Sequence, residues 1–162
     1  MVMQSNQSEK KSSIPYNGLK SDYNTLAKFV YIYEKEIKGL NSESQFSQKY
    51  SQAFCVFKNK LKENIKNATQ EELIQEVEES KKHTIYFTKY KFQVWDLCRH
   101  LRNSISHAII EKGEIEKRKK IIKIPDKYRG KFTSKGYLDY SSIKEFIVKL
   151  ENEYEEKENQ QI

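Results

Sequence analysis

Hydrophobic residues recur every three to four positions along most of this chain, which predicts amphipathic helices. One stripe begins near residue 21 and ends before Gly39, with Lys and Glu on its far face. A second begins at Ser42, which forms a capping-box pattern with Gln45, and runs to about Lys66. The inward positions of these two stripes are Leu26, Phe29, Val30, Tyr33 and Ile37, and then Phe46, Tyr50, Ala53, Phe57 and Leu61.

The middle of the chain continues this helical pattern. Thr69 with Glu72 is another capping box, and the next long helix is expected from about residue 85 to residue 112, before Gly113. No glycine or proline interrupts residues 40–112, which favours a helical body over any sheet architecture in this span. The apolar arc of the long helix consists of Val94, Leu97, Cys98, Leu101, Ile105, Ala108 and Ile109.

The sequence pattern changes after Gly113, where β-branched residues and two further glycines predict a small β-hairpin of residues 119–124 with 134–139. Ser142 with Glu145 is expected to cap a last helix, which frays into an acidic tail after Glu151. Its stripe is Ile143, Phe146, Ile147, Leu150 and Tyr154. We therefore predict an all-α, up-down bundle of four to five helices with a small β-hairpin before the last helix. Residues 1–20 form a disordered or loosely docked arm, 21–157 a single domain, and 158–162 a frayed tail.

Composition and charge narrow the possible partners. The net charge is +7 and the pI is near 9.2, which favours a polyanion, nucleic acid first and an anionic membrane surface second, although a merely Lys-rich protein has the same balance. The longest apolar run, Phe29 to Tyr33, is far too short to span a bilayer, and the N-terminal residues have no signal-peptide core. A cytoplasmic protein without membrane contact is expected. Cys55 and Cys98 lie on apolar stripes and are predicted to be reduced core residues.

Hydrogen-bonding and titratable side chains gather on the other side of the long helix, at Asp96, Arg99, His100, Asn103, Ser106 and His107. An imidazole such as that of His107 exchanges a proton near neutral pH, and the permanent charge of Arg102 could stabilise a developing phosphorane. The alternatives are a surface histidine at a helix end and a solvated arginine. On a regular helix Arg102 and His107 lie about 140° apart around the axis. If the two side chains act together, either the helix distorts between them or residues from two copies of the chain form one site.

The order Arg102-Asn103-Ser104-Ile105-Ser106-His107 resembles the motif of the HEPN family. HEPN domains are small helical proteins, and many are RNases with an Arg separated from a His by four to six residues, often with Asn after the Arg. The segment from Gly130 to Phe146 is also similar to the tail of a plasmid- and phage-defence-associated HEPN subgroup. The resemblance implies a metal-independent endoribonuclease that dimerises, so that motifs from both protomers line one cleft.

Two further residues are carried over from the resemblance. Asn103 would orient the imidazole or a phosphate oxygen, with an ordinary helix-face amide as the alternative. Asp96, two turns earlier, could hold Arg102 or His107 in place. His100 and His107 could suggest a metal pair, but no third ligand is evident nearby, and we expect neither metal nor cofactor.

The segment from Lys117 to Lys135 contains nine basic residues against one acid, Asp126, with Tyr128 and Phe132 interleaved. Basic side chains neutralise phosphates and aromatic rings stack on unpaired bases, so this segment is predicted to bind RNA. The alternative is a solvated hairpin, or one that matches the acidic last helix. The proposed RNA-binding residues are Lys117, Arg118, Lys119, Lys120, Lys123, Arg129 and Lys131.

The leading hypothesis is thus a homodimeric HEPN-type endoribonuclease, a toxin or abortive-infection effector that cleaves RNA by 2′-hydroxyl attack. The alternatives are a catalytically silent HEPN-like module that binds RNA or protein, and a small helical DNA-binding or adaptor protein with an accidental motif. An antitoxin protein is a possible partner. In HEPN toxins controlled by a nucleotidyltransferase, a modified Tyr commonly follows the motif His by two residues; Ile109 occupies that position here, so an antitoxin would act by another route.

Overall fold

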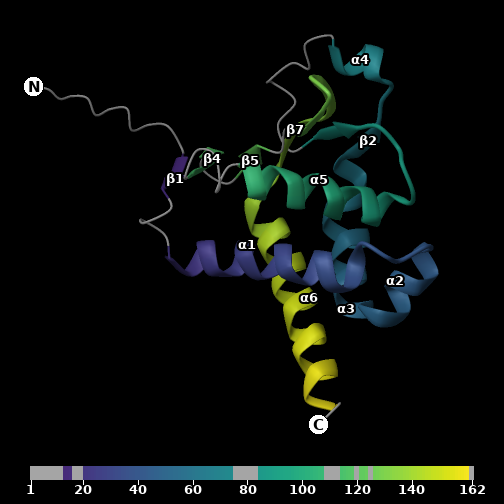
Figure 1. Ribbon diagram of the computed structural model, residues 1–162, viewed down its shortest axis with the longest axis vertical. Coiled ribbons are helices and arrows are strands. Elements are labelled where there is room, and N and C mark those ends of the chain that lie inside the picture. Colours follow the sequence, from purple (N-terminus) through teal and green to yellow (C-terminus); the bar gives the residue numbers. More distant parts are fainter. Residues whose placement is uncertain are drawn as a thin grey trace, which may run out of the picture.

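Helices make up most of the described chain (Figure 1). The computed structural model describes residues 13–15, 20–74, 84–107, 114–118, 121–123 and 126–160. The α-helices are α1 (Lys20–Ile32), α2 (Glu43–Lys49), α3 (Ser51–Val56), α4 (Gln70–Ile74), α5 (Gln93–His107) and α6 (Tyr140–Gln160). Two π-helical turns continue these helices: η2 (Tyr33–Ile37) follows α1, and η3 (Phe57–Leu61) follows α3. The 3₁₀ turn η4 (Lys62–Asn64) follows η3. The predicted helical fold is confirmed.

Both internal N-terminal caps form. The Ser42 hydroxyl accepts the Gln45 N–H at 3.2 Å at the start of α2, and the Gln45 side chain accepts the N–H of Asn41, one residue before the cap. Thr69 and Glu72 bond reciprocally at the start of α4, at 3.1 and 2.9 Å. The helix expected to run on from Ser42 is instead divided at Tyr50, whose φ of −132° and ψ of 60° leave the helical region.

The strands form a larger sheet than the expected hairpin. Within the described ranges they pair in the order β1-β4-β5-β7-β3-β2, with β6 also on β7, and only the β2–β3 pair is parallel. The predicted hairpin is present, because Ile121 pairs with Asp139 and Lys123 with Tyr137. The bounds are β1 Ser13–Pro15, β2 Ile65–Asn67, β3 Ile85–Phe87, β4 Glu114–Arg118, β5 Ile121–Lys123, β6 Asp126–Tyr128 and β7 Lys131–Asp139.

Two strands contradict the prediction that residues 40–112 hold no sheet. β2 and β3 are three residues each, too short for an alternating pattern to stand out, and the glycine that lets β3 pair lies far along the chain at Gly136. Residues 85–87 are therefore a strand, and α5 begins at Gln93 rather than near residue 85. Of the expected end of that helix, residues 108–112 lie outside the described part of the chain.

The last helix also differs from its prediction at both ends. Asp139 is its N-terminal cap, because its Oδ2 atom accepts hydrogen bonds from the Ser142 N–H at 2.9 Å and from the hydroxyls of Ser141 and Ser142. The helix α6 therefore begins at Tyr140 rather than at Ser142. The helix does not fray after Glu151 but continues to Gln160, since Glu153 and Tyr154 are both buried.

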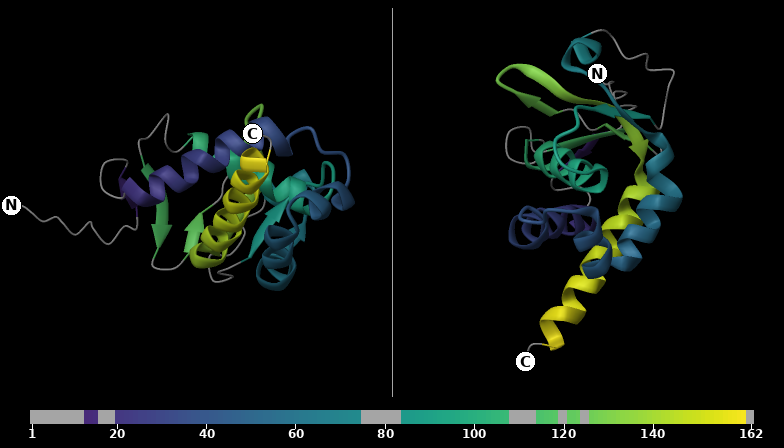
Figure 2. Two further views of the ribbon diagram at one scale, coloured as in Figure 1. Left: turned by 90° about the horizontal axis from the view of Figure 1, so that it is seen from below. Right: turned by 90° about the vertical axis from the view of Figure 1, so that its right-hand side faces the viewer.

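The long helix α5 lies between the sheet and the α1–η2 helix (Figure 2). Both faces are therefore covered, which the sequence pattern did not indicate. The described members of the predicted apolar arc are buried, but so are Asp96 and His100, which were expected on the open side. The His100 ring lies 5.0 Å from that of Phe87 on β3.

The two cysteines differ in environment. Cys98 is fully buried on α5, and burial raises the pKa of its thiol. Cys55, on α3, is exposed, so the prediction that both are core residues is wrong for Cys55. Neither forms a disulfide.

A buried carboxylate joins the last helix to the helical body. Glu153 of α6 accepts the backbone N–H groups of Gln52 at 3.2 Å and of Ala53 at 3.0 Å, at the start of α3. Only 9% of Glu153 is exposed. The carboxylate thus caps α3 from a helix about a hundred residues later in the chain.

We expect Glu153→Ala to lower the free energy of unfolding by about 2–3 kcal/mol, because two backbone donors lose a charged acceptor. Urea denaturation followed by circular dichroism measures this loss. Glu156→Ala is the matched control, since Glu156 is an exposed glutamate of the same helix. Equal unfolding midpoints for the two variants would contradict the capping role.

Candidate active site

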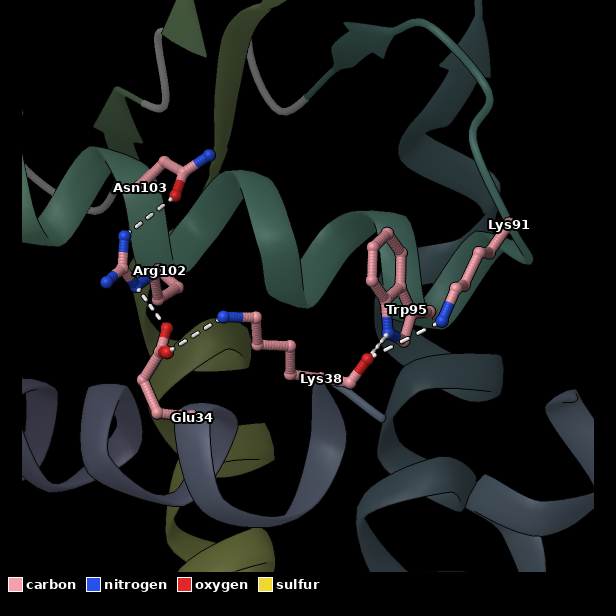
Figure 3. Close-up of polar contacts among 6 residues, drawn as sticks. All are labelled: Glu34, Lys38, Lys91, Trp95, Arg102 and Asn103. Atoms are coloured by element: carbon pink, nitrogen blue, oxygen red, sulfur yellow. Dashed lines mark hydrogen bonds and ion pairs between the residues drawn. The ribbon is translucent and has the colours of Figure 1, made fainter. Parts of the chain in front are cut away.

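Arg102 lies on the side of α5 that faces η2, and its guanidinium meets Glu34 of that turn (Figure 3). The Arg102 Nε atom is 2.9 Å from Glu34 Oε2, but its N–H does not point at the carboxylate. The contact is therefore an ion pair rather than a well-formed hydrogen bond. The Arg102 side chain is 32% exposed, so solvent screens this pair in part.

Asn103 completes the described part of the motif. Arg102 Nη1 donates to Asn103 Oδ1 at 3.1 Å, an interaction between neighbours in sequence. In Figure 3 the Asn103 side chain leans away from η2, so that it holds the guanidinium from the opposite direction to Glu34. Among the described residues, Arg102 Nη2 forms no hydrogen bond or ion pair, which leaves donors of the fork for an anion.

Glu34 and Lys38 are site residues that the sequence analysis missed. They belong to the Lys- and Glu-rich far face of the first helix, to which the sequence analysis assigned no role. Lys38 Nζ lies 3.3 Å from Glu34 Oε1, so one carboxylate joins two cations. The only local signal is their i, i+4 spacing, which is common on exposed helix faces and therefore carries little information.

His107 is the last residue of α5, and its side chain lies outside the described part of the structure. The helix is α-helical through all of Gln93–His107, in contrast to the π-helical turns of η2 and η3. Positions five residues apart on such a helix are separated by about 140°. The structure thus brings Arg102 and Asn103 together and gives no distortion that would bring the His107 position onto the side of Arg102.

Asp96 has a different place from the one expected. Its fully buried carboxylate accepts the backbone N–H of Tyr90 at 3.1 Å and of Lys91 at 3.0 Å, in the loop before α5. Among the contacts of the described residues, none joins Asp96 to Arg102 or Asn103. Asp96 fixes the loop that enters the helix, and it does not contact the described side chains of the motif.

The basic segment falls on the sheet. Lys117 and Arg118 are in β4, Lys123 is in β5, and Lys119 and Lys120 lie outside the described residues. Arg129 and Gly130, with φ of 53° and 79°, form the two-residue turn between β6 and β7, and β6 contacts α5. Arg129 and Lys131 are exposed there.

Phe132, one of the two aromatic rings of this segment, is engaged within the chain. Lys127 Nζ lies 4.6 Å from its ring centroid and Lys135 Nζ lies 4.4 Å from it. The hairpin therefore presents exposed positive charge, while its phenylalanine is already covered by cations.

Comparison with known proteins agrees with the motif and the fold. The family model described as HEPN pEK499 p136 matches residues 3–161, which is nearly the whole chain. No curated protein and no solved structure matches. No helix within the described ranges is long and apolar enough to cross a membrane. With the Arg-Asn pair on a central helix and a match over residues 3–161, the chain belongs to the HEPN family.

Proposed function

We propose that this protein is a metal-independent endoribonuclease in which Arg102 and His107 act on RNA. The observation that carries the proposal is the Arg102 guanidinium, held from two sides by Glu34 and Asn103 at an accessible edge of α5, with donors to spare. A forked, permanently charged donor set suits a phosphate whose negative charge increases in the transition state. Family membership supports the same chemistry, since many HEPN domains are RNases.

The proposed reaction needs only proton transfer and charge stabilisation. A neutral imidazole takes the proton of a ribose 2′-hydroxyl, and the 2′-oxygen attacks the adjacent phosphorus. As that bond forms, the bond from phosphorus to the 5′-oxygen breaks, and an imidazolium gives the leaving oxygen its proton. The products are a 2′,3′-cyclic phosphate and a free 5′-hydroxyl. Arg102 would stabilise the dianionic phosphorane between these steps.

Two protomers are proposed to form the site. The regular geometry of α5 supports this arrangement, because Arg102 and the His107 position do not share one side of the helix. Across a two-fold axis, two His107 side chains could divide the base and acid roles. The exposed charges of Arg129 and Lys131 would guide the RNA backbone toward the site.

The proposed biological setting is supported by the family alone. We propose a toxin or abortive-infection effector of the cytoplasm that an antitoxin protein holds in check. A second candidate function is a catalytically silent module that binds RNA or protein. The Glu34–Arg102 ion pair favours this candidate, since a partly neutralised guanidinium attracts phosphate less strongly.

The proposed chemistry is tested with the wild-type protein and a labelled folded RNA in excess EDTA, beside an all-deoxy copy of the same strand. We expect cleavage of the RNA alone, with cyclic-phosphate ends, because the attacking group is the 2′-hydroxyl and no metal is involved. His107→Ala should abolish this cleavage. Cleavage of the deoxy strand, or loss of activity in EDTA, would contradict the proposal, and binding without cleavage by wild type would favour the silent module.

A further inference from the structure

An aromatic side chain stands exposed in the loop before α5, on the helix that carries the motif. Tyr90 is 67% exposed, more than any other large hydrophobic side chain of the described residues. Its ring stacks on that of Trp95, at 5.5 Å between centroids and 20° between planes. Trp95 is only 5% exposed and donates its indole N–H to the Lys38 carbonyl oxygen at 3.2 Å. The tyrosine therefore rests on a fixed, buried base.

The loop that carries Tyr90 is held in place from below. The Asp96 carboxylate accepts the N–H of Tyr90 itself and that of Lys91. The Lys91 ammonium group in turn donates a hydrogen bond to the Leu40 carbonyl oxygen at 3.0 Å. A ring held in this way loses little conformational entropy when a ligand stacks on it.

Cations surround the ring pair. The Arg99 guanidinium carbon lies 5.2 Å from the Tyr90 centroid, and Lys91 Nζ lies 4.5 Å from the Trp95 centroid. The Asp96 carboxylate of α5 is buried and bonded to the backbone N–H groups of this loop, and among the contacts of the described residues it pairs with neither cation. An exposed aromatic ring flanked by cations matches a nucleotide, which joins a π-face to a negative phosphate.

The platform also lies next to the motif. Arg99 is three residues, about 4.5 Å of axial rise, before Arg102. Both arginines act on the same neighbour, since the charges of Arg99 and Arg102 each lower the pKa of Tyr33, which burial nevertheless raises to about 12. A nucleotide seated on Tyr90 would thus direct its backbone along Arg99 toward Arg102.

We propose that Tyr90, stacked on Trp95 and flanked by Arg99 and Lys91, is a subsite that stacks an unpaired nucleobase of RNA beside the phosphate held by Arg102. This inference rests on the proposed function, because it assumes an RNA substrate. It differs from the basic hairpin, where Phe132 is only partly exposed and two lysines lie over its ring, whereas Tyr90 is 67% exposed and has one cation, Arg99, over its ring. The subsite gives preference for single-stranded segments without reading a particular base.

The test uses a fluorescein-labelled, eight-nucleotide 2′-O-methyl RNA, which can bind but cannot be cut at its blocked 2′-oxygens. Anisotropy gives the dissociation constant, and the emission of Trp95, the single tryptophan of the chain, reports stacking. We expect Tyr90→Ala to weaken binding about 5- to 100-fold. Tyr90→Phe, which keeps the ring, should bind within about twofold of wild type, and wild-type Trp95 emission should change on binding.

Tyr31→Ala is the matched control, because Tyr31 is an exposed tyrosine, at 52%, on α1. Wild-type affinity in Tyr90→Ala, or an equal loss in Tyr31→Ala, would overturn the subsite. A Tyr90→Ala variant that instead loses a concentration-dependent dimer, with RNA affinity unchanged, would assign the surface to a second copy of the chain. Cleavage is measured separately on unmodified RNA with Arg102→Ala, so that a failure of the nuclease proposal remains distinguishable from a failure of the stacking site.

Discussion

Arg102→Ala is expected to reduce the rate of RNA cleavage by about 10²- to 10³-fold, the loss typical of removing one donor to a developing negative charge. The reason is the position of the guanidinium, which Glu34 and Asn103 hold in place while part of its fork stays available. Arg102→Lys should recover only a small part of the rate, because an ammonium cannot bind two phosphate oxygens in the geometry of the fork. Single-turnover cleavage at saturating protein measures this chemical step apart from binding.

The control for lost charge is Lys58→Ala, which removes one exposed cation from η3 and should leave cleavage within about twofold. Glu34→Gln tests whether Glu34 orients the Arg102 guanidinium or mainly neutralises its charge.

If Glu34 mainly orients Arg102, this variant lowers the single-turnover rate and leaves RNA affinity unchanged. If the ion pair instead keeps the guanidinium from phosphate, Glu34→Gln strengthens RNA binding. Full activity in Arg102→Ala would remove this arginine from the mechanism.

Gly136→Ala is expected to destabilise the fold by about 2–5 kcal/mol, because overpacking costs about 1–3 kcal/mol and a side chain in a left-handed backbone conformation about 1–2 kcal/mol more. Gly136 lies where β7 ends its pairing with β3 and begins its pairing with β5. A Cβ there would lie 2.3 Å from the Thr84 carbonyl oxygen and 2.9 Å from the Ile85 Cα. Its φ of 128° adds strain for any residue with a side chain.

Substitutions of two other glycines separate the two causes of this loss of stability, which are the steric clash of the new Cβ and the strain of a positive φ. Gly39 has open space around a built Cβ, so Gly39→Ala should change stability by less than about 0.5 kcal/mol. Gly130 also has open space but a φ of 79°, so Gly130→Ala measures backbone strain alone, about 1–2 kcal/mol. Urea unfolding of the three variants gives the comparison. If Gly136→Ala lowers the free energy of unfolding no more than Gly130→Ala does, β3 moves to accommodate the new methyl group and the predicted clash is wrong.

Local signals predicted the helical body correctly. The stripes from Phe46 to Leu61 and from Ile143 to Tyr154 are buried, and the boxes at Ser42 and Thr69 form. These features act within one or two turns of helix, so neighbouring residues contain the whole signal. The Arg-Asn…His spacing is likewise contained in six consecutive residues, and the family match confirms the resemblance that this motif and the segment from Gly130 to Phe146 indicated.

Contacts between distant segments had no such signal. The pairing of β3 with β7 depends on a glycine some fifty residues away, and Glu34 meets Arg102 across a similar span. Asp96 was placed on the wrong side because one hydrophobic arc implies one buried face, whereas α5 is covered on two. A buried carboxylate is tolerated there because two backbone donors satisfy it.

The sequence by itself therefore determined the apolar stripes of the helices, the caps at Ser42 and Thr69, the net charge and the motif, because periodicity and short-range hydrogen bonds depend on residues that are close together in the chain. The tertiary structure alone decided that Glu34 faces Arg102, that Asp96 anchors a loop, and that Tyr90 stands exposed over Trp95. Each of these depends on which elements pack together, and packing is set by the summed burial of the whole chain rather than by any local pattern.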